Sequence, residues 1–254
     1  MAVSSPSLTT IAALIIDARR SLSNAEYNPA IRLRMGGEVR RYSGPLLSAA
    51  ILAGGRSRRM GHDKALLEIA GRPMLELVAE RAAAVADELF IVASGRPEYA
   101  RFGFPVVEDR FPGLGSLGGI YTALVAAAHP YCLVVGCDMP LLHPALLRYL
   151  AEQKRDYDAL VPALAAERSD QGGEETLEAL HAIYSRAAAP VLQARLRAGQ
   201  LKIADALAEL RLRRVDEATI RRFDPQLRSF LNVNTPDQVD MVIGLLEHER
   251  AARP

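Results

Sequence analysis

The chain has 254 residues and a net charge of +1; half of its residues are hydrophobic and 24% are charged. This balance is typical of a folded α/β protein and argues against nucleic acid or a membrane surface as partner. The two cysteines, Cys132 and Cys137, fit neither a disulfide framework nor a CxxC metal site, and no apolar stretch approaches the ~20 residues of a membrane span. We therefore expect a cytoplasmic protein with no nucleic-acid and no membrane partner.

The first 45 residues differ in composition from the rest. A short apolar stretch (Thr10 to Arg20) is followed by a polar stretch and by a basic region around Gly36-Gly37-Glu38. We predict that residues 1–45 form a partly disordered N-terminal extension and that residues 46–254 form one domain.

From Leu46 onward, short apolar runs alternate with glycine turns and helical patterns. The expected elements are strands at 46–53, 89–93, 105–107, 131–135, 159–161, 177–184 and 230–232; helices from Pro73, at 117–128, from Pro144, at 187–197 and at 203–210; and a polar loop at 167–175. Thr235-Pro236-Asp237-Gln238 has the pattern of a capping box that starts a last helix. Strands that alternate with helices predict a three-layer α/β/α domain with a mostly parallel sheet.

The strongest chemical signal is the segment from Leu52 to Lys64, LAGGRSRRMGHDK. It follows the first strand of the domain, and ligands of open parallel sheets bind beyond the carboxyl ends of the strands. Glycines there allow backbone N–H groups to approach phosphate oxygens, and three arginines and a lysine supply positive charge. His62 stands where a Walker A motif requires lysine. The segment therefore predicts a site for a nucleoside triphosphate.

A second glycine-rich segment, Gly113 to Gly118, fits the GxGxxG pattern of dinucleotide-binding proteins. Five residues separate it from the preceding strand, whereas that fingerprint requires a tight turn directly after the strand. It also leaves the segment from Arg56 to Lys64 without a role. We therefore favour the triphosphate site over a dehydrogenase.

Acidic and amide side chains follow three other strands. Asp138 comes directly after the buried strand at 131–135, and a single carboxylate beside a triphosphate is a suitable Mg²⁺ ligand, although the residue could also cap its turn. Asp109 follows the strand at 105–107 and could accept hydrogen bonds from a base or ribose. Asn232 and Asn234 alternate where the last strand meets the last helix, so both amides could reach one site.

The five histidines show no metal-binding spacing. His62 and His181 are the two that could contact a substrate, and a role in packing or at the surface is the alternative for both.

Taken together, these motifs resemble the molybdenum cofactor guanylyltransferases, a family of nucleotidyltransferases with a glycosyltransferase-A-like (nucleotide-diphospho-sugar transferase) fold. The resemblance covers roughly Ser48 to His248. It rests on LAGGRSRRMGHDKALLEIAGRP, VVEDRFPGLGSLGG, CDMP and NVNTPDQ, in that order. The family commonly has GPLAG or GPLGG where this chain has Gly115 to Gly119, and a polar residue near Val92 to Ser94.

The resemblance implies a role for each residue that matches a family motif. The nucleotide-binding residues would be Leu52, Ala53, Gly54, Gly55, Lys64, Asp109 and Asp138. Asp138 would also bind the metal, Mg²⁺, and Asn232 and Asn234 would lie beside the metal and the pterin phosphate. Lys64 and Arg59 would stabilise the developing negative charge.

The expected reaction is attack by the terminal phosphate of molybdopterin on the α-phosphorus of GTP, which releases pyrophosphate. The partners would then be GTP and molybdopterin, with molybdoenzyme-assembly proteins as further candidates. A cytidylyltransferase acting on the same pterin and a sugar-1-phosphate nucleotidyltransferase are the enzymatic alternatives. A nucleotide-binding protein that delivers cofactor without catalysis is the non-enzymatic one.

Overall fold

The structure is a computed structural model that describes residues 46–54, 63–165 and 175–251. The predicted N-terminal extension at 1–45 and nearly all of the predicted loop at 167–175 lie outside these ranges. So do Gly55, Arg59 and His62.

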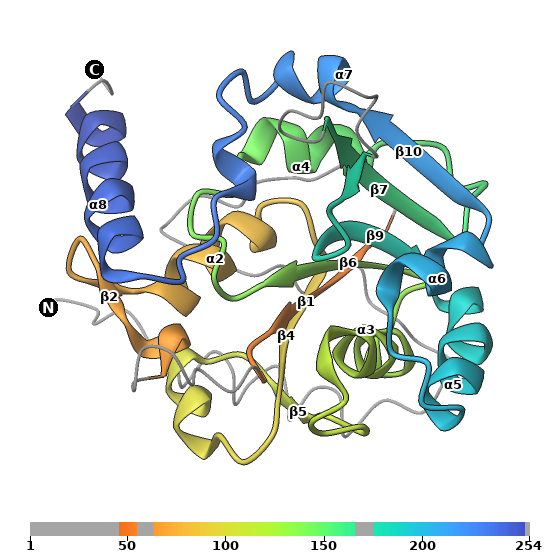
Figure 1. Cartoon of the computed structure of the whole chain (residues 1–254). Coiled ribbons are helices and arrows are strands. Elements are labelled where there is room, and N and C mark those ends of the chain that lie inside the picture. Colours follow the sequence, from red (N-terminus) through yellow and green to blue (C-terminus); the bar gives the residue numbers. More distant parts are fainter. Residues whose placement is uncertain (1–45, 55–62, 166–174, 252–254) are drawn as a thin grey trace, which may run out of the picture.

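A single eight-stranded sheet forms the centre of the molecule (Figure 1). Its strands are β1 (Ser48–Leu52), β4 (Glu88–Ala93), β5 (Val106–Glu108), β6 (Tyr131–Gly136), β7 (Ala159–Leu164), β8 (Thr176–Leu177), β9 (His181–Ser185) and β10 (Leu212–Asp216). The order is β10-β7-β9-β6-β1-β4-β5, with β8 paired to β7. Strand β9 runs antiparallel to β6 and β7, and β8 runs antiparallel to β7; the other pairs are parallel. The prediction of a mostly parallel sheet is confirmed.

Helices cover both faces of this sheet. One face packs on α2 (Met74–Ala83), α4 (Pro144–Ala151) and α7 (Glu217–Arg221). The other packs on α3 (Gly115–Ala126), α5 (Ala189–Arg197) and α6 (Ile203–Ala208). The central strands are buried on both sides, which is why β1, β4 and β6 read as continuous apolar runs in the sequence. The three-layer α/β/α prediction is confirmed (Figure 1).

A smaller apolar cluster attaches the last helix, α8 (Pro236–Ala251), to the edge of the domain. It joins α8 to the two-stranded hairpin of β2 (Glu68–Ile69) and β3 (Arg72–Pro73), which the sequence reasoning missed. The predicted capping box is present: the Thr235 N–H donates to Gln238 Oε1 at 3.1 Å, and the Gln238 N–H donates to Thr235 Oγ1 at 3.4 Å. Among the residues that the structure describes, no helix is long and apolar enough to cross a membrane.

Two strand predictions near the C-terminus were wrong. The expected strand at 177–184 is divided into β8 and β9, because the His181 N–H bonds back to the Glu178 carbonyl at 3.0 Å and closes a turn. The expected strand at 230–232 is instead a 3-10 helix, η4 (Arg228–Phe230), followed by irregular chain. The Asp224 carboxylate accepts the N–H groups of Arg228 and Ser229 and so holds this segment in a turn.

The strand order reverses at β1. The chain passes from β1 to β4 and β5 on one side and then returns to place β6 on the other side of β1. Such a switch point leaves a crevice outside the carboxyl ends of the two central strands, where ligands of open α/β sheets bind. The segments that follow β1 and β6 are those that the sequence singled out.

Candidate active site

Lys64, Asp138 and Asn234 come together at the carboxyl edge of the sheet. The Lys64 ammonium donates a hydrogen bond to Asn234 Oδ1 at 2.5 Å, and it lies 4.0 Å from Asp138 Oδ2. The Lys64 and Asp138 side chains are 17% and 29% exposed, so water screens this pair less than it screens a surface pair. One cation and one carboxylate therefore lie side by side at the switch point. A carboxylate suits a metal ion that also binds phosphate oxygens, and a cation suits the phosphate itself.

Two neighbouring segments fix the position of Asp138. It follows β6, and its carbonyl accepts the Val233 N–H at 2.9 Å, which ties it to the segment that carries Asn234. Burial raises the pKa of the Asp138 carboxyl, and the charge of Lys64 opposes this shift. No group of three or more acidic, histidine or cysteine side chains within the described ranges could hold a metal. The role of Asp138 as a metal ligand stays a prediction.

The first residues of the segment after β1 are held by the sheet. The Leu52 carbonyl accepts the Cys137 N–H at 3.1 Å, and the Ala53 N–H donates to the Val92 carbonyl at 2.9 Å. These bonds hold Leu52 and Ala53 in the sheet, and Gly54 is the last described residue before the chain leaves the described range. Gly54 is exposed. Gly55 and Arg59, which were also predicted to bind here, lie outside the described residues.

Asp109 organises the loop between β5 and α3. Its Oδ1 accepts hydrogen bonds from Thr122 Oγ1 at 2.8 Å and from the Phe111 N–H at 3.0 Å. The glycine-rich segment has a packing role: a Cβ atom at Gly118 would lie 2.9 Å from the Phe111 carbonyl oxygen. A Cβ atom at Gly119 would lie 2.9 Å from Leu52 Cδ1, so the glycines bring α3 close to the end of β1. Within the GxGxxG pattern, Gly118 is explained by this packing contact, and Gly113 and Gly115 by their positive φ angles of 85° and 73°.

Asn232 and Asn234 differ in their surroundings. Asn234 contacts Lys64, whereas Asn232 is exposed and makes no hydrogen bond with any described residue. The alternation expected from a strand does not apply, because the chain is irregular here. Contact of either amide with a substrate therefore stays a prediction.

Comparisons with known proteins agree with this geometry. The family model of the MobA-like NTP transferase domain matches residues 49–239, which is more than half of the chain. The chain belongs to this family. It is a nucleotidyltransferase, as its sequence predicts, and the match includes every candidate site residue named above.

Individual relatives support the same family assignment. A probable molybdenum cofactor guanylyltransferase from Pelotomaculum thermopropionicum is 38% identical over 206 residues, which cover 81% of this chain and 96% of the relative. The crystal structure of molybdopterin-guanine dinucleotide biosynthesis protein A from Archaeoglobus fulgidus is similar, with a TM-score of 0.66 and 28% identity, and the match covers 79% of this chain and 99% of that one.

A more distant structure confirms the nucleotide-diphospho-sugar transferase fold alone. The 2-C-methyl-D-erythritol 4-phosphate cytidylyltransferase from Thermus thermophilus matches with a TM-score of 0.62 and 17% identity, over 80% of this chain and 100% of that one.

Two residues near the candidate site were given no role by sequence reasoning. Ser94 follows β4 at the same sheet edge, and its Oγ is buried with no hydrogen-bond partner among the described residues. Asp63, the residue before Lys64, accepts the Tyr99 hydroxyl with both carboxylate oxygens, at 2.8 and 2.7 Å. Tyr99 resembles any apolar core residue in the sequence, so only the fold reveals its hydroxyl contact.

His181 is a packing residue in this structure. It is fully buried, packs against Phe230 with ring centroids 4.8 Å apart and the rings tilted by 31°, and has no hydrogen bond at either ring nitrogen within the described structure. This placement favours the packing alternative over contact with a substrate.

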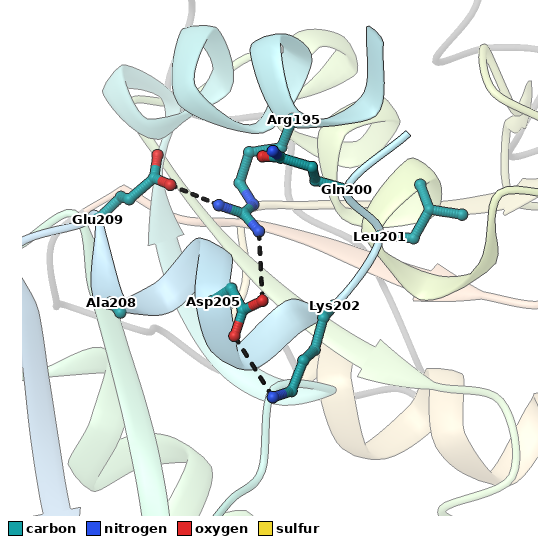
Figure 2. A pocket seen from close by; sticks show the side chains of 7 residues that line it. All are labelled: Arg195, Gln200, Leu201, Lys202, Asp205, Ala208 and Glu209. Atoms are coloured by element: carbon teal, nitrogen blue, oxygen red, sulfur yellow. Dashed lines mark hydrogen bonds and ion pairs between the residues drawn. The ribbon is translucent and has the colours of Figure 1, made fainter. Parts of the chain in front are cut away.

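A hollow of about 590 Å³ lies away from these residues, between α5 and α6 (Figure 2). Its wall is the buried guanidinium of Arg195, which donates to Glu209 and lies 3.6 Å from Asp205; Lys202 lies 3.5 Å from Asp205. The two cations and two carboxylates cancel, so the cluster has no net charge with which to attract a nucleotide. We interpret it as a cross-link that joins the two helices.

Proposed function

We propose that this protein transfers GMP from GTP to molybdopterin, forming molybdopterin guanine dinucleotide and releasing pyrophosphate. The observation that carries the proposal is the 4.0 Å approach of Lys64 to Asp138 at the switch point of a nucleotidyltransferase fold. The choice of guanine over cytosine, and of molybdopterin over a sugar phosphate, is supported by the names of the relative from Pelotomaculum thermopropionicum and the structure from Archaeoglobus fulgidus.

The chemical step forms one bond and breaks another. An oxygen of the terminal phosphate of molybdopterin attacks the α-phosphorus of GTP, and the bond from that phosphorus to the bridging oxygen breaks. The electron pair of this bond leaves with pyrophosphate. No nucleophile of the protein is required, so the side chains act by positioning and by neutralising charge.

Lys64 supplies a fixed positive charge to the triphosphate. Its ammonium is held by Asn234, so it is oriented before the nucleotide binds and little reorganisation is required during the reaction. Among the described residues of this segment, Gly54 is suited to a close backbone approach to the phosphates, because it has no side chain and is exposed at the end of β1. Arg59 is proposed to add charge to the departing pyrophosphate.

Nucleotidyl transfer generally uses a divalent metal. We propose Mg²⁺, because this ion is commonly bound by one or two carboxylates together with substrate phosphates, and Asp138 offers a partly exposed carboxylate beside a cation. Bound Mg²⁺ would act as a Lewis acid toward the phosphate oxygens. Asp138 would hold the metal, and Lys64 would keep the Asp138 carboxylate ionised in spite of its burial. Ser94 and Asp109 are proposed to contact the nucleoside.

The deciding experiment is a pyrophosphate-release assay with molybdopterin and each of GTP, CTP, ATP and UTP in the presence of Mg²⁺. We expect release with GTP and a product with the mass of molybdopterin guanine dinucleotide. Equal or faster release with CTP would replace guanylyl with cytidylyl transfer, and binding without release would favour a cofactor-delivery protein. Transfer of the product to molybdoenzyme-assembly proteins and a cytoplasmic location stay predictions.

A further inference from the structure

The backbone of Lys64 is fixed from its N-terminal side by a buried contact. Asp63 caps the 3-10 helix η1 (Lys64–Leu66), because its Oδ1 accepts the Ala65 N–H at 3.1 Å. Both oxygens of the same carboxylate accept the hydroxyl of Tyr99, and Arg96 lies 3.5 Å from Oδ2. Tyr99 is itself fully buried, in the 3-10 helix η2 (Pro97–Phe102) that follows β4.

The C-terminal side of η1 is fixed as well. The Leu67 N–H donates to the Lys64 carbonyl at 3.1 Å, and the Leu67 carbonyl accepts the Met74 N–H at 2.8 Å, at the start of α2. The main chain of Lys64 is therefore held between the Tyr99 contact on one side and α2 on the other. At the tip of the Lys64 side chain, the ammonium donates to Asn234.

We propose that Asp63 and Tyr99 are positioning residues that hold Lys64 where its ammonium meets the triphosphate. This inference rests on the proposed function, and it assigns a role to two residues that would not touch the substrate. A negative charge near a triphosphate would otherwise oppose binding, so the role of Asp63 must come from its geometry. The Tyr99 hydroxyl and the Arg96 guanidinium offset that charge.

The hydrogen bond from Tyr99 to Asp63 does not depend on pH in the working range of the protein. Burial raises the pKa of Tyr99, and the hydrogen bond to Asp63 raises it further, so the hydroxyl stays protonated and donates at every pH at which the protein would work. A buried hydroxyl without its acceptor is costly, which favours retention of the contact.

The first test is a binding cycle of Tyr99→Phe, Lys64→Ala and the double variant, with the affinity for Mg²⁺ and GTP measured by calorimetry. We expect Tyr99→Phe to weaken GTP binding about fivefold to tenfold in the parent, as expected for the loss of one hydrogen bond. In the Lys64→Ala background the same change should have no effect, because no ammonium remains to be positioned. Equal losses in both backgrounds, or no loss in the parent, would overturn the proposal.

Tyr157→Phe is the matched control. Tyr157 is also fully buried and its hydroxyl also pairs with a side chain, accepting from Arg155 at 2.8 Å, but it precedes β7 at the opposite edge of the sheet. We expect both Tyr→Phe variants to lose similar thermal stability and only Tyr99→Phe to lose affinity for GTP. Equal affinity losses in the two would mean a general effect of stability and would overturn the proposal.

A second pair of variants separates geometry from charge. Asparagine at position 63 can still cap η1 and accept the Tyr99 hydroxyl, whereas alanine can do neither. Asp63→Asn should therefore bind GTP several-fold more tightly than Asp63→Ala; equal affinities would assign the effect to charge alone and contradict the positioning role. If the parent protein binds no GTP, the proposed function itself is wrong. If the parent and every Tyr99 and Asp63 variant bind GTP equally well, only the positioning role is wrong.

Discussion

Lys64 and Asn234 are 170 positions apart in the chain, and the ammonium of one donates to the amide oxygen of the other at 2.5 Å. The bond joins the segment after β1 to the segment before α8. The Asn234 side-chain nitrogen is still a donor. Because the amide is neutral, the bond holds Lys64 near Asp138 without cancelling the positive charge of Lys64. The amide therefore orients the charge of Lys64 beside Asp138.

Removal of the Asn234 amide should weaken GTP binding without abolishing it. We expect Asn234→Ala to raise the dissociation constant for GTP about tenfold, because Lys64 keeps its charge but loses its orientation. Lys64→Ala should have the larger effect, since it removes the charge itself. Titration with a non-hydrolysable GTP analogue measures both.

Asn232→Ala provides the comparison. This residue is exposed and contacts neither Lys64 nor any other described side chain through a hydrogen bond. If it meets the pterin phosphate as predicted, its variant should raise the KM for molybdopterin and leave the affinity for GTP unchanged. A loss of GTP affinity as large as that of Asn234→Ala would remove the distinction between the two amides.

Asp138→Asn should abolish transfer and preserve the fold. The carboxamide has nearly the same shape but binds Mg²⁺ weakly, so we expect the rate of pyrophosphate release to fall by about 100-fold or more. The melting temperature should stay the same or rise, because burial raises the pKa of Asp138 and so disfavours its charged form in the folded protein. The exposed Asp156, which pairs with Lys154, is a suitable control for loss of a carboxylate. Turnover of Asp138→Asn within about tenfold of the parent would disprove the metal assignment.

The sheet could be predicted from the sequence because its central strands are buried on both faces. Continuous apolar runs mark β1, β4 and β6, and the predicted site residues Leu52 and Asp138 are placed by those runs alone. The rule that ligands bind at the carboxyl ends of such strands then brings these residues to one edge. The apolar pattern of the strands and one topological rule were therefore sufficient to predict the positions of Leu52 and Asp138.

Other parts depend on contacts between distant segments, which no local pattern records. Strand β10 was missed because it is an edge strand with the charged residues Arg213 and Arg214, and edge strands commonly carry charge. The segment at 230–232 alternates like a strand, but the distant turn at Asp224 prevents an extended conformation. The partners of Lys64 and Asp63 likewise require the folded chain.

Loss of the Arg195 cation and loss of the two carboxylates of its cluster should have unequal effects on stability. The Arg195 side chain is 9% exposed, whereas Asp205 and Glu209 are about half exposed. Arg195→Met keeps the apolar stem and leaves the carboxylates in water, so its free energy of unfolding should stay within about 1 kcal/mol of the parent. The double variant Asp205→Asn with Glu209→Gln leaves a buried guanidinium without a counter-charge and should cost about 2 kcal/mol or more.

Chemical denaturation at low salt measures both effects, with the affinity for GTP as the accompanying control. Neither set of variants should change GTP binding, because none of the three residues lies at the carboxyl edge of β1 or β6. If Arg195→Met were the more destabilising change, the cluster would contribute net stability as an ion pair, and the predicted order of the two effects would be wrong.

His181 should make the stability of the protein depend on pH. Burial is the largest influence on this residue and lowers its pKa from 6.5 to about 4, while the charge of Asp224 acts in the opposite direction. As the pH falls through 6.5, the unfolded chain binds a proton that the folded protein does not, so the free energy of unfolding decreases between pH 6.5 and 4. The contribution over this window is on the order of 3 kcal/mol.

His181→Leu tests this directly, because leucine removes the titrating group and, within the described structure, breaks no hydrogen bond of a ring nitrogen. We expect the variant to show a flatter decrease in unfolding free energy between pH 7 and pH 4.5 than the parent, measured by urea denaturation at several pH values. His248→Leu, on the exposed side of α8, should retain the slope of the parent. An unchanged slope in His181→Leu would mean that the folded protein accommodates the charged imidazole, for example by turning it toward Asp224, and that acid sensitivity originates elsewhere.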